Sequence, residues 1–162
     1  MRRLTLIRHA RSSRDYPLLD DIDRPLDARG RSEAPEMAQR LKAALTPPLR
    51  LVSSPAMRAL TTAQAFAEVL EIPDAGIQVL PEIYEATPGT LLHLVNRFDD
   101  ADPQVLMFGH NPGLSELAQL LADMPFAELP TCAAATLAFE VASWRDVAPQ
   151  GGKLLSYRFP KE

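Results

Sequence analysis

The sequence predicts an α/β fold, a three-layer α/β/α sandwich in which helices cover both faces of a mostly parallel sheet. Short apolar runs of strand character alternate along the chain with longer segments whose apolar residues recur at helical spacing. A length of 162 residues suits one domain, so we expect residues 1–162 to form a single domain. Hydrophobic residues make up 46% of the chain and charged residues 23%, which is typical of a globular protein and excludes a disordered one.

The predicted strands are short runs of apolar residues. Residues 4–7 form the first run, which stops abruptly at Arg8 and His9, as expected of a buried strand that ends at a polar site. The other predicted strands cover residues 50–53, 77–80, 104–108, 134–141 and 154–159.

The predicted helices follow capping signals. Apolar residues at helical spacing predict a helix over residues 32–45, with Asp27 upstream as a cap. Ser54 and Pro55 supply a capping residue and a first-turn proline for the second helix, which runs to residue 70. The remaining helices are expected from Thr87-Pro88 to residue 95 and over residues 114–121.

Composition and charge exclude several classes of function. Lys and Arg number 17 and Asp and Glu 21, so the net charge of −4 disfavours a nucleic-acid or anionic membrane partner. No apolar run approaches the roughly 18 residues of a membrane span, and the N-terminal one is too short for a signal peptide, so we expect a cytoplasmic protein. The lone Cys132 has no disulfide partner and is expected to be a small buried residue.

Cationic and imidazole groups follow three of the predicted strands. Arg8, His9 and Arg11 follow the first, Arg58 comes shortly after the second, and His110 follows the strand over residues 104–108. Ligands of open α/β sheets bind beyond the carboxyl ends of the strands, where guanidinium groups suit phosphate oxygens. We therefore expect these residues to converge on one anion-binding pocket in an otherwise acidic protein.

Three motifs resemble, in order and spacing, those of the histidine phosphatase superfamily. They are residues 4–12 (LTLIRHARS), Ser53-Ser54-Pro55 with Arg58, and Gly109-His110-Asn111. The first motif of that superfamily usually has glycine where this chain has Ala10. This departure, the short length and residues 23–26 (DRPL) with Arg29-Gly30 are similar to the SixA-type branch of phosphohistidine phosphatases.

The resemblance implies a phosphoglycerate-mutase-like fold and a phosphoryl transfer that uses no metal ion or other cofactor. It implies that His9 is the nucleophile and is transiently phosphorylated, while Arg8, Arg58 and His110 hold the phosphoryl group. Physical chemistry agrees, because nearby guanidinium groups disfavour protonation of His9 and a neutral imidazole is a competent nucleophile. No zinc-type motif and no phosphate-binding loop of the Gly-x-x-x-x-Gly-Lys type is present in the sequence.

Other roles are less specific. The resemblance puts Glu82 where relatives carry the proton donor, and Glu85, three residues on, is an alternative for that role. Arg11 is expected to help bind phosphate, although Arg11 and Arg24 could each lie at the edge of the pocket or be ordinary surface charges.

We interpret the protein as a phosphatase that hydrolyses phosphohistidine in a protein partner. One alternative is a broad-specificity phosphomonoesterase that acts on small phosphorylated metabolites. Another is a non-catalytic phospho-binding module, which would need the arginines but no nucleophilic histidine.

Overall fold

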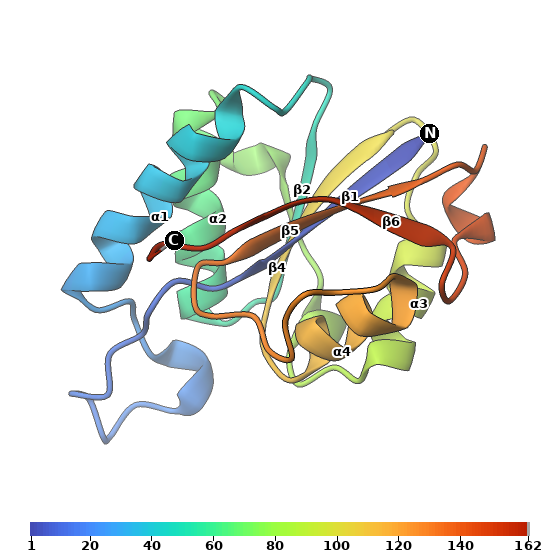
Figure 1. Ribbon diagram of the computed structural model, residues 1–162. Helices are drawn as coiled ribbons and strands as arrows, with labels where there is room; N and C mark the ends of the chain where they lie inside the picture. The colour runs from blue at the N-terminus through green and yellow to red at the C-terminus, as the bar shows by residue number, and fades with distance from the viewer. Residues whose placement is uncertain (162) are drawn as a thin grey trace.

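The computed structural model describes residues 1–161 and shows a six-stranded sheet between two layers of helices (Figure 1). The strands are β1 (Arg2–Arg8), β2 (Arg50–Ser53), β3 (Ile77–Val79), β4 (Gln104–Gly109), β5 (Ala134–Phe139) and β6 (Gly152–Arg158). Their order in the sheet is β3-β2-β4-β1-β5-β6. β1 to β4 are parallel to their neighbours in that set, whereas β5 is antiparallel to both β1 and β6. The predicted α/β fold with a mostly parallel sheet is confirmed.

Two helices cover each face of the sheet. The helices are α1 (Ala28–Lys42), α2 (Met57–Val69), α3 (Pro88–Asn96) and α4 (Gly113–Leu121). α1 and α2 pack on one face and α3 and α4 on the other, each pair with its own hydrophobic cluster (Figure 1). Short 3-10 turns complete the chain: η1 (Asp21–Asp23), η2 (Asp74–Gly76), η3 (Pro81–Ile83) and η4 (Trp144–Asp146). Among residues 1–161, no helix has the length and apolar character that crossing a membrane requires.

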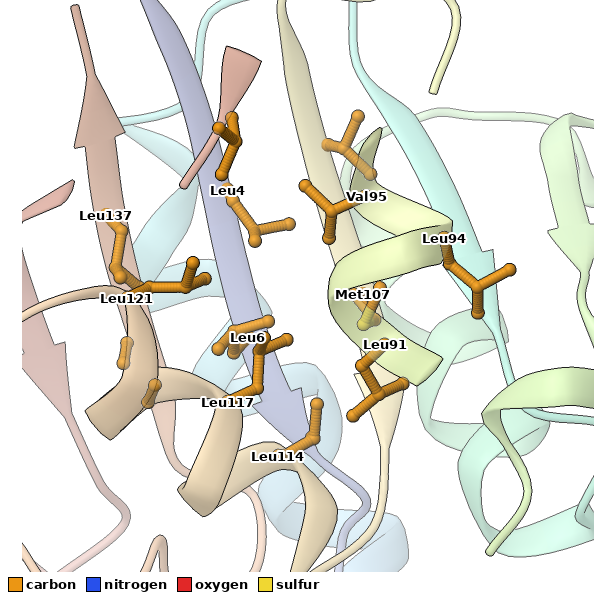
Figure 2. Packing of buried hydrophobic residues seen from close by; sticks show 14 of the residues in the cluster. Leu4, Leu6, Leu91, Leu94, Val95, Met107, Leu114, Leu117, Leu121 and Leu137 are labelled. Atoms are coloured by element: carbon orange, nitrogen blue, oxygen red, sulfur yellow. The ribbon is translucent and has the colours of Figure 1, made fainter. Parts of the chain in front are cut away.

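In the core beneath α3 and α4, residues that alternate along a strand pack against residues at helical spacing. Leu4 and Leu6 alternate on one face of β1 and meet Leu91 of α3 and Leu114 and Leu117 of α4 (Figure 2). All five are at most 1% exposed. Truncating any of them to alanine would cost about 2–5 kcal/mol of stability, because the cavity left behind collapses only partly.

Two helices begin elsewhere than predicted. α1 begins at Ala28 rather than residue 32, because the Asp27 side chain accepts a hydrogen bond from the Gly30 N–H and so supports an earlier first turn. The expectation that Ser54 caps the second helix is wrong. α2 begins at Met57, and its N-cap makes no side-chain capping bond. The predicted cap of α3 is confirmed, since the Thr87 side chain accepts from the Thr90 N–H.

The register of the parallel strands aligns their carboxyl ends. Arg8 of β1 lies opposite Gly109 of β4, and Ser53 of β2 lies opposite Phe108. Backbone hydrogen bonds continue this pairing one residue further, from the His9 N–H to the Gly109 carbonyl at 3.0 Å. The three chain segments that carry the sequence motifs therefore leave the sheet side by side.

Candidate active site

Two adjoining cavities open at the carboxyl edge of the sheet. The first, about 540 Å³ and here called the arginine cavity, is lined by Arg8, His9, Arg11, Arg24, Arg58 and His110 among others. The second, about 660 Å³ and here called the tyrosine cavity, shares Arg58 and His110 with the first and adds Asp21, Tyr84 and Glu85. The predicted convergence of the four motif residues Arg8, His9, Arg58 and His110 is therefore observed.

His9 is buried and its ring is oriented by the main chain. Its Nδ1 lies 2.7 Å from the Ala10 carbonyl oxygen, which can only accept, so Nδ1 carries the hydrogen and Nε2 has the lone pair. The Ala10 N–H in turn donates to the Thr62 hydroxyl at 2.9 Å. Burial lowers the pKa of His9 from 6.5 to about 3, with the nearby His110 and arginines acting in the same direction. His9 is thus a neutral imidazole at pH 7.

His110 stands beside His9, with 5.2 Å between the ring centroids. Its Nε2 lies 2.8 Å from the Ser54 hydroxyl, which also accepts from the Ala56 N–H at 3.1 Å. A Ser54 hydroxyl that donates to Nε2 leaves the ring hydrogen on Nδ1, an atom that is buried and has no partner within residues 1–161. Burial, followed by the charge of Arg58, lowers the pKa of His110 from 6.5 to about 4.

The two motif arginines are held by different neighbours. Arg8 donates through Nη1 to the Leu129 carbonyl oxygen at 2.9 Å, and Glu128 lies 3.8 Å from the same atom. The Arg58 side chain is only 8% exposed and donates from both terminal nitrogens to Asp21. Both guanidinium groups line the arginine cavity. Their two positive charges would attract an anion to it.

Arg11 and Arg24 also line the arginine cavity. Arg11 is half-exposed and forms an ion pair with Asp27 at 2.9 Å. Arg24 donates to the Ser12 hydroxyl at 2.9 Å and to the Ser13 carbonyl oxygen at 3.1 Å. Both arginines belong to the segment between β1 and α1, and these contacts hold their side chains to other residues of the same segment.

The structure does not bring Glu82 to this cleft. Ile83 is buried in the core at the η3 turn, and the neighbouring Glu82 points outward to Arg97 at 3.7 Å. Glu82 and Arg97 line a separate cavity of about 390 Å³. Glu85 instead lines the tyrosine cavity, together with His110, Asp21 and Glu116.

Three contacts of the site were not expected from sequence. Ser54 contacts His110 rather than capping a helix, Asp21 binds Arg58, and Tyr84 packs its ring edge-on to His110 at 5.6 Å. Only Ser54 gave a signal, because it belongs to a recognised motif. The Tyr84 hydroxyl, then Arg58 and Arg24, hold the pKa of the Asp21 carboxyl far below its usual range.

Comparison with known proteins gives matches over most of the chain. A sequence model of the histidine phosphatase superfamily (branch 1) matches residues 4–99. The chain belongs to this superfamily. An uncharacterised chloroplastic protein of Arabidopsis thaliana is 33% identical, over 94% of this chain and 75% of its own. An uncharacterised protein of Mycobacterium tuberculosis is 34% identical, over 96% of this chain and all of its own.

Several solved structures have the same fold. SixA of Agrobacterium tumefaciens is 25% identical, with a TM-score of 0.81 over 98% of this chain and 99% of its own. The protein histidine phosphatase SixA in complex with tungstate is 24% identical, with a TM-score of 0.78 over 98% and 97% of the two chains. A mycobacterial glucosyl-3-phosphoglycerate phosphatase is 18% identical, with a TM-score of 0.70 over 96% and 98% of the two chains. The resemblance found in the sequence, its fold and the phosphatase class of enzyme are thereby confirmed.

Proposed function

We propose that this phosphatase hydrolyses phosphohistidine in a protein substrate through a phosphorylated His9, without a metal ion. The observation that carries the proposal is the state of His9: buried, neutral, and held through Nδ1 so that Nε2 keeps its lone pair. A neutral imidazole with a free lone pair is a nucleophile toward phosphorus. Arg8 and Arg58 supply positive charge of the kind that metal ions provide in other phosphoryl transferases.

The reaction takes two displacements at phosphorus. In the first, His9 Nε2 forms a bond to phosphorus while the bond to the substrate nitrogen breaks, and the departing imidazole keeps that electron pair and takes up a proton. In the second, the oxygen of a water molecule bonds to the phosphorus on His9 and the water loses a proton. The bond between phosphorus and Nε2 breaks, so inorganic phosphate leaves and Nε2 keeps that electron pair as its lone pair. Arg8 and Arg58 donate to the phosphoryl oxygens as negative charge spreads over them, and His110 holds the group from the same cavity wall.

We assign the proton donor for poor leaving groups to Glu85 rather than Glu82. Glu85 lines the tyrosine cavity, which shares Arg58 and His110 with the arginine cavity but is not lined by His9. In-line displacement requires the nucleophile and the leaving group on opposite sides of phosphorus. A phosphoryl group held between the two cavities would therefore have its leaving group on the Glu85 side.

A protein substrate is favoured by the rim of the cleft. Residues 13–15 line the arginine cavity, and the loop continues into Tyr16 and Leu18, which are 54% and 99% exposed. Large exposed apolar side chains beside a site are typical of surfaces that contact another macromolecule. The similarity to SixA of Agrobacterium tumefaciens, which extends over 99% of that chain, also supports a protein substrate.

A phosphomonoesterase for small metabolites is the second candidate. The tyrosine cavity, at about 660 Å³, adjoins the phosphate-binding groups and is within the size range of small-molecule pockets. The walls of this cavity would surround the leaving group of a small substrate, which would then need no contact with Tyr16 or Leu18 at the rim.

The experiment is phosphate release from a phosphohistidine-bearing protein, a sugar phosphate and an aryl phosphate. We expect the highest kcat/KM on the protein substrate and no turnover by a His9→Ala variant on any of them. A Leu18→Ser variant should lower kcat/KM on the protein while leaving the aryl phosphate unchanged. A higher kcat/KM on the sugar phosphate, with no effect of Leu18→Ser on the protein substrate, would favour the second candidate.

A further inference from the structure

Asp21 lines the tyrosine cavity, binds Arg58, which lines both cavities, and is held from several sides. Its Oδ2 accepts from Arg58 Nη2 at 2.9 Å and from the Tyr84 hydroxyl at 2.6 Å. Its Oδ1 accepts from Arg24 Nε at 3.1 Å, and its main-chain carbonyl oxygen accepts from Arg58 Nη1 at 2.7 Å. One residue of the η1 turn thus joins two arginines of the arginine cavity to the aromatic wall of the tyrosine cavity.

Arg58 depends on Asp21 for its orientation. Within residues 1–161, every hydrogen bond donated by the Arg58 side chain is accepted by Asp21, through the carboxylate on one nitrogen and the main-chain oxygen on the other. This two-point contact fixes the plane of the guanidinium group and still leaves one N–H on each terminal nitrogen. Those N–H groups remain available to a phosphoryl oxygen.

Asp21 also fixes the ring that borders His110. Tyr84 belongs to the segment that follows β3, 63 residues along the chain from Asp21, and its ring meets His110 edge-on with 5.6 Å between centroids. A displaced Tyr84 would leave His110 free to move on that side. The two groups assigned to hold the phosphoryl group are therefore both steadied by Asp21.

The charge of Asp21 acts against anion binding. A carboxylate 2.9 Å from Arg58 offsets part of the positive charge that would attract phosphate. We propose that Asp21 is a positioning residue, which holds Arg58 and the wall beside His110 in the arrangement that phosphoryl transfer requires, at the expense of affinity for bound phosphate. This inference rests on the proposed function of the same cleft.

The test is Asp21→Asn. An asparagine has one acceptor oxygen, so its NH₂ group must face either Arg24 or the pair of Arg58 and Tyr84. The Tyr84 hydroxyl could accept from this NH₂ group, but neither guanidinium group can, so one arginine contact is lost in either orientation. On an aryl phosphate we expect kcat to fall about 10- to 100-fold through misplacement of Arg58. The dissociation constant for inorganic phosphate, measured by calorimetry, should be unchanged or smaller, because a negative charge has been removed.

Asp23→Asn is the matched control. Asp23 lies in the same turn and is exposed, so this variant has the same change in net charge. It should leave kcat and phosphate affinity as in the wild type. Tyr84→Phe, which keeps the ring but removes its contact with Asp21, is a second variant, and it should lower kcat without weakening phosphate binding.

Two results would overturn the proposal. One is a parallel loss of kcat and phosphate affinity in both Asp21→Asn and Tyr84→Phe, which would make Asp21 a structural support of the cleft. The other is wild-type kcat in both variants. Failure of the proposed function is distinguishable, since it would appear as an inactive wild-type enzyme whose phosphate binding can still be measured.

Discussion

The burial of His9 predicts a loss of stability in mild acid. An unfolded histidine takes up a proton near its ordinary pKa of 6.5, whereas folded His9 stays neutral until about pH 3. Because the folded pKa is the lower one, stability is complete above pH 6.5 and falls as the pH drops from there toward 3. His110, with a folded pKa of about 4, acts in the same direction.

The size of the stability loss follows from the pH range over which only the unfolded state is protonated. Each pH unit below 6.5 in which only the unfolded state is protonated costs about 1.4 kcal/mol per group. At pH 4.5 the contribution of His9 is therefore about 3 kcal/mol, a large part of the roughly 5–15 kcal/mol that stabilises a typical domain. Most carboxylates are still ionised at this pH, which keeps their contribution small.

The assay is urea unfolding at pH 7.5 and pH 4.5, followed by circular dichroism. The difference in unfolding free energy between the two pH values should be about 3 kcal/mol smaller in His9→Gln than in the wild type. Comparing the two pH values within each protein removes any pH-independent effect of the substitution. His93→Gln is the control, since His93 is exposed on α3 and should leave the pH dependence unchanged. Equal pH dependence in wild type and His9→Gln would refute a buried neutral His9.

Three further outcomes are expected. Ser54→Ala should lower kcat on an aryl phosphate about 10-fold by releasing Nε2 of His110, with no change in fold by circular dichroism. Glu85→Gln should lower kcat/KM on an alkyl phosphate about 100-fold and spare most activity on a phosphohistidine protein, whereas Glu82→Gln should alter neither. Gly30→Ala should lower the unfolding free energy by about 1–3 kcal/mol in urea, because its Cβ would overlap the main-chain carbonyl oxygen of Arg11.

The arrangement of the motif residues could be predicted from sequence because parallel strands end at one edge of a sheet. Arg8, His9 and His110 follow β1 and β4 directly, and these strands are neighbours in the sheet. Arg58 is the second residue of α2, the helix that follows β2, and β2 pairs with β4 on the side away from β1. Local sequence patterns are therefore sufficient to predict that these four residues lie close together.

The remaining contacts depend on tertiary packing that no local pattern encodes. Asp21 and Tyr84 are 63 residues apart and meet only when the loop before α1 folds over the segment after β3. The direction of Glu82 is set by Ile83, which is buried at the η3 turn. If the η3 turn were shifted by one residue, Glu82 would take the buried position of Ile83 and would no longer face Arg97.

The most direct test of the mechanism is to trap the phosphorylated enzyme. A protein carrying radiolabelled phosphohistidine is mixed with the phosphatase, and the reaction is stopped with alkali within milliseconds. We predict a label on the phosphatase that is stable in alkali, lost in acid and located at His9 by peptide mapping, with none on His9→Gln. Turnover of the substrate with no label on the wild-type protein, or a label that persists on His9→Gln, would contradict covalent catalysis by His9.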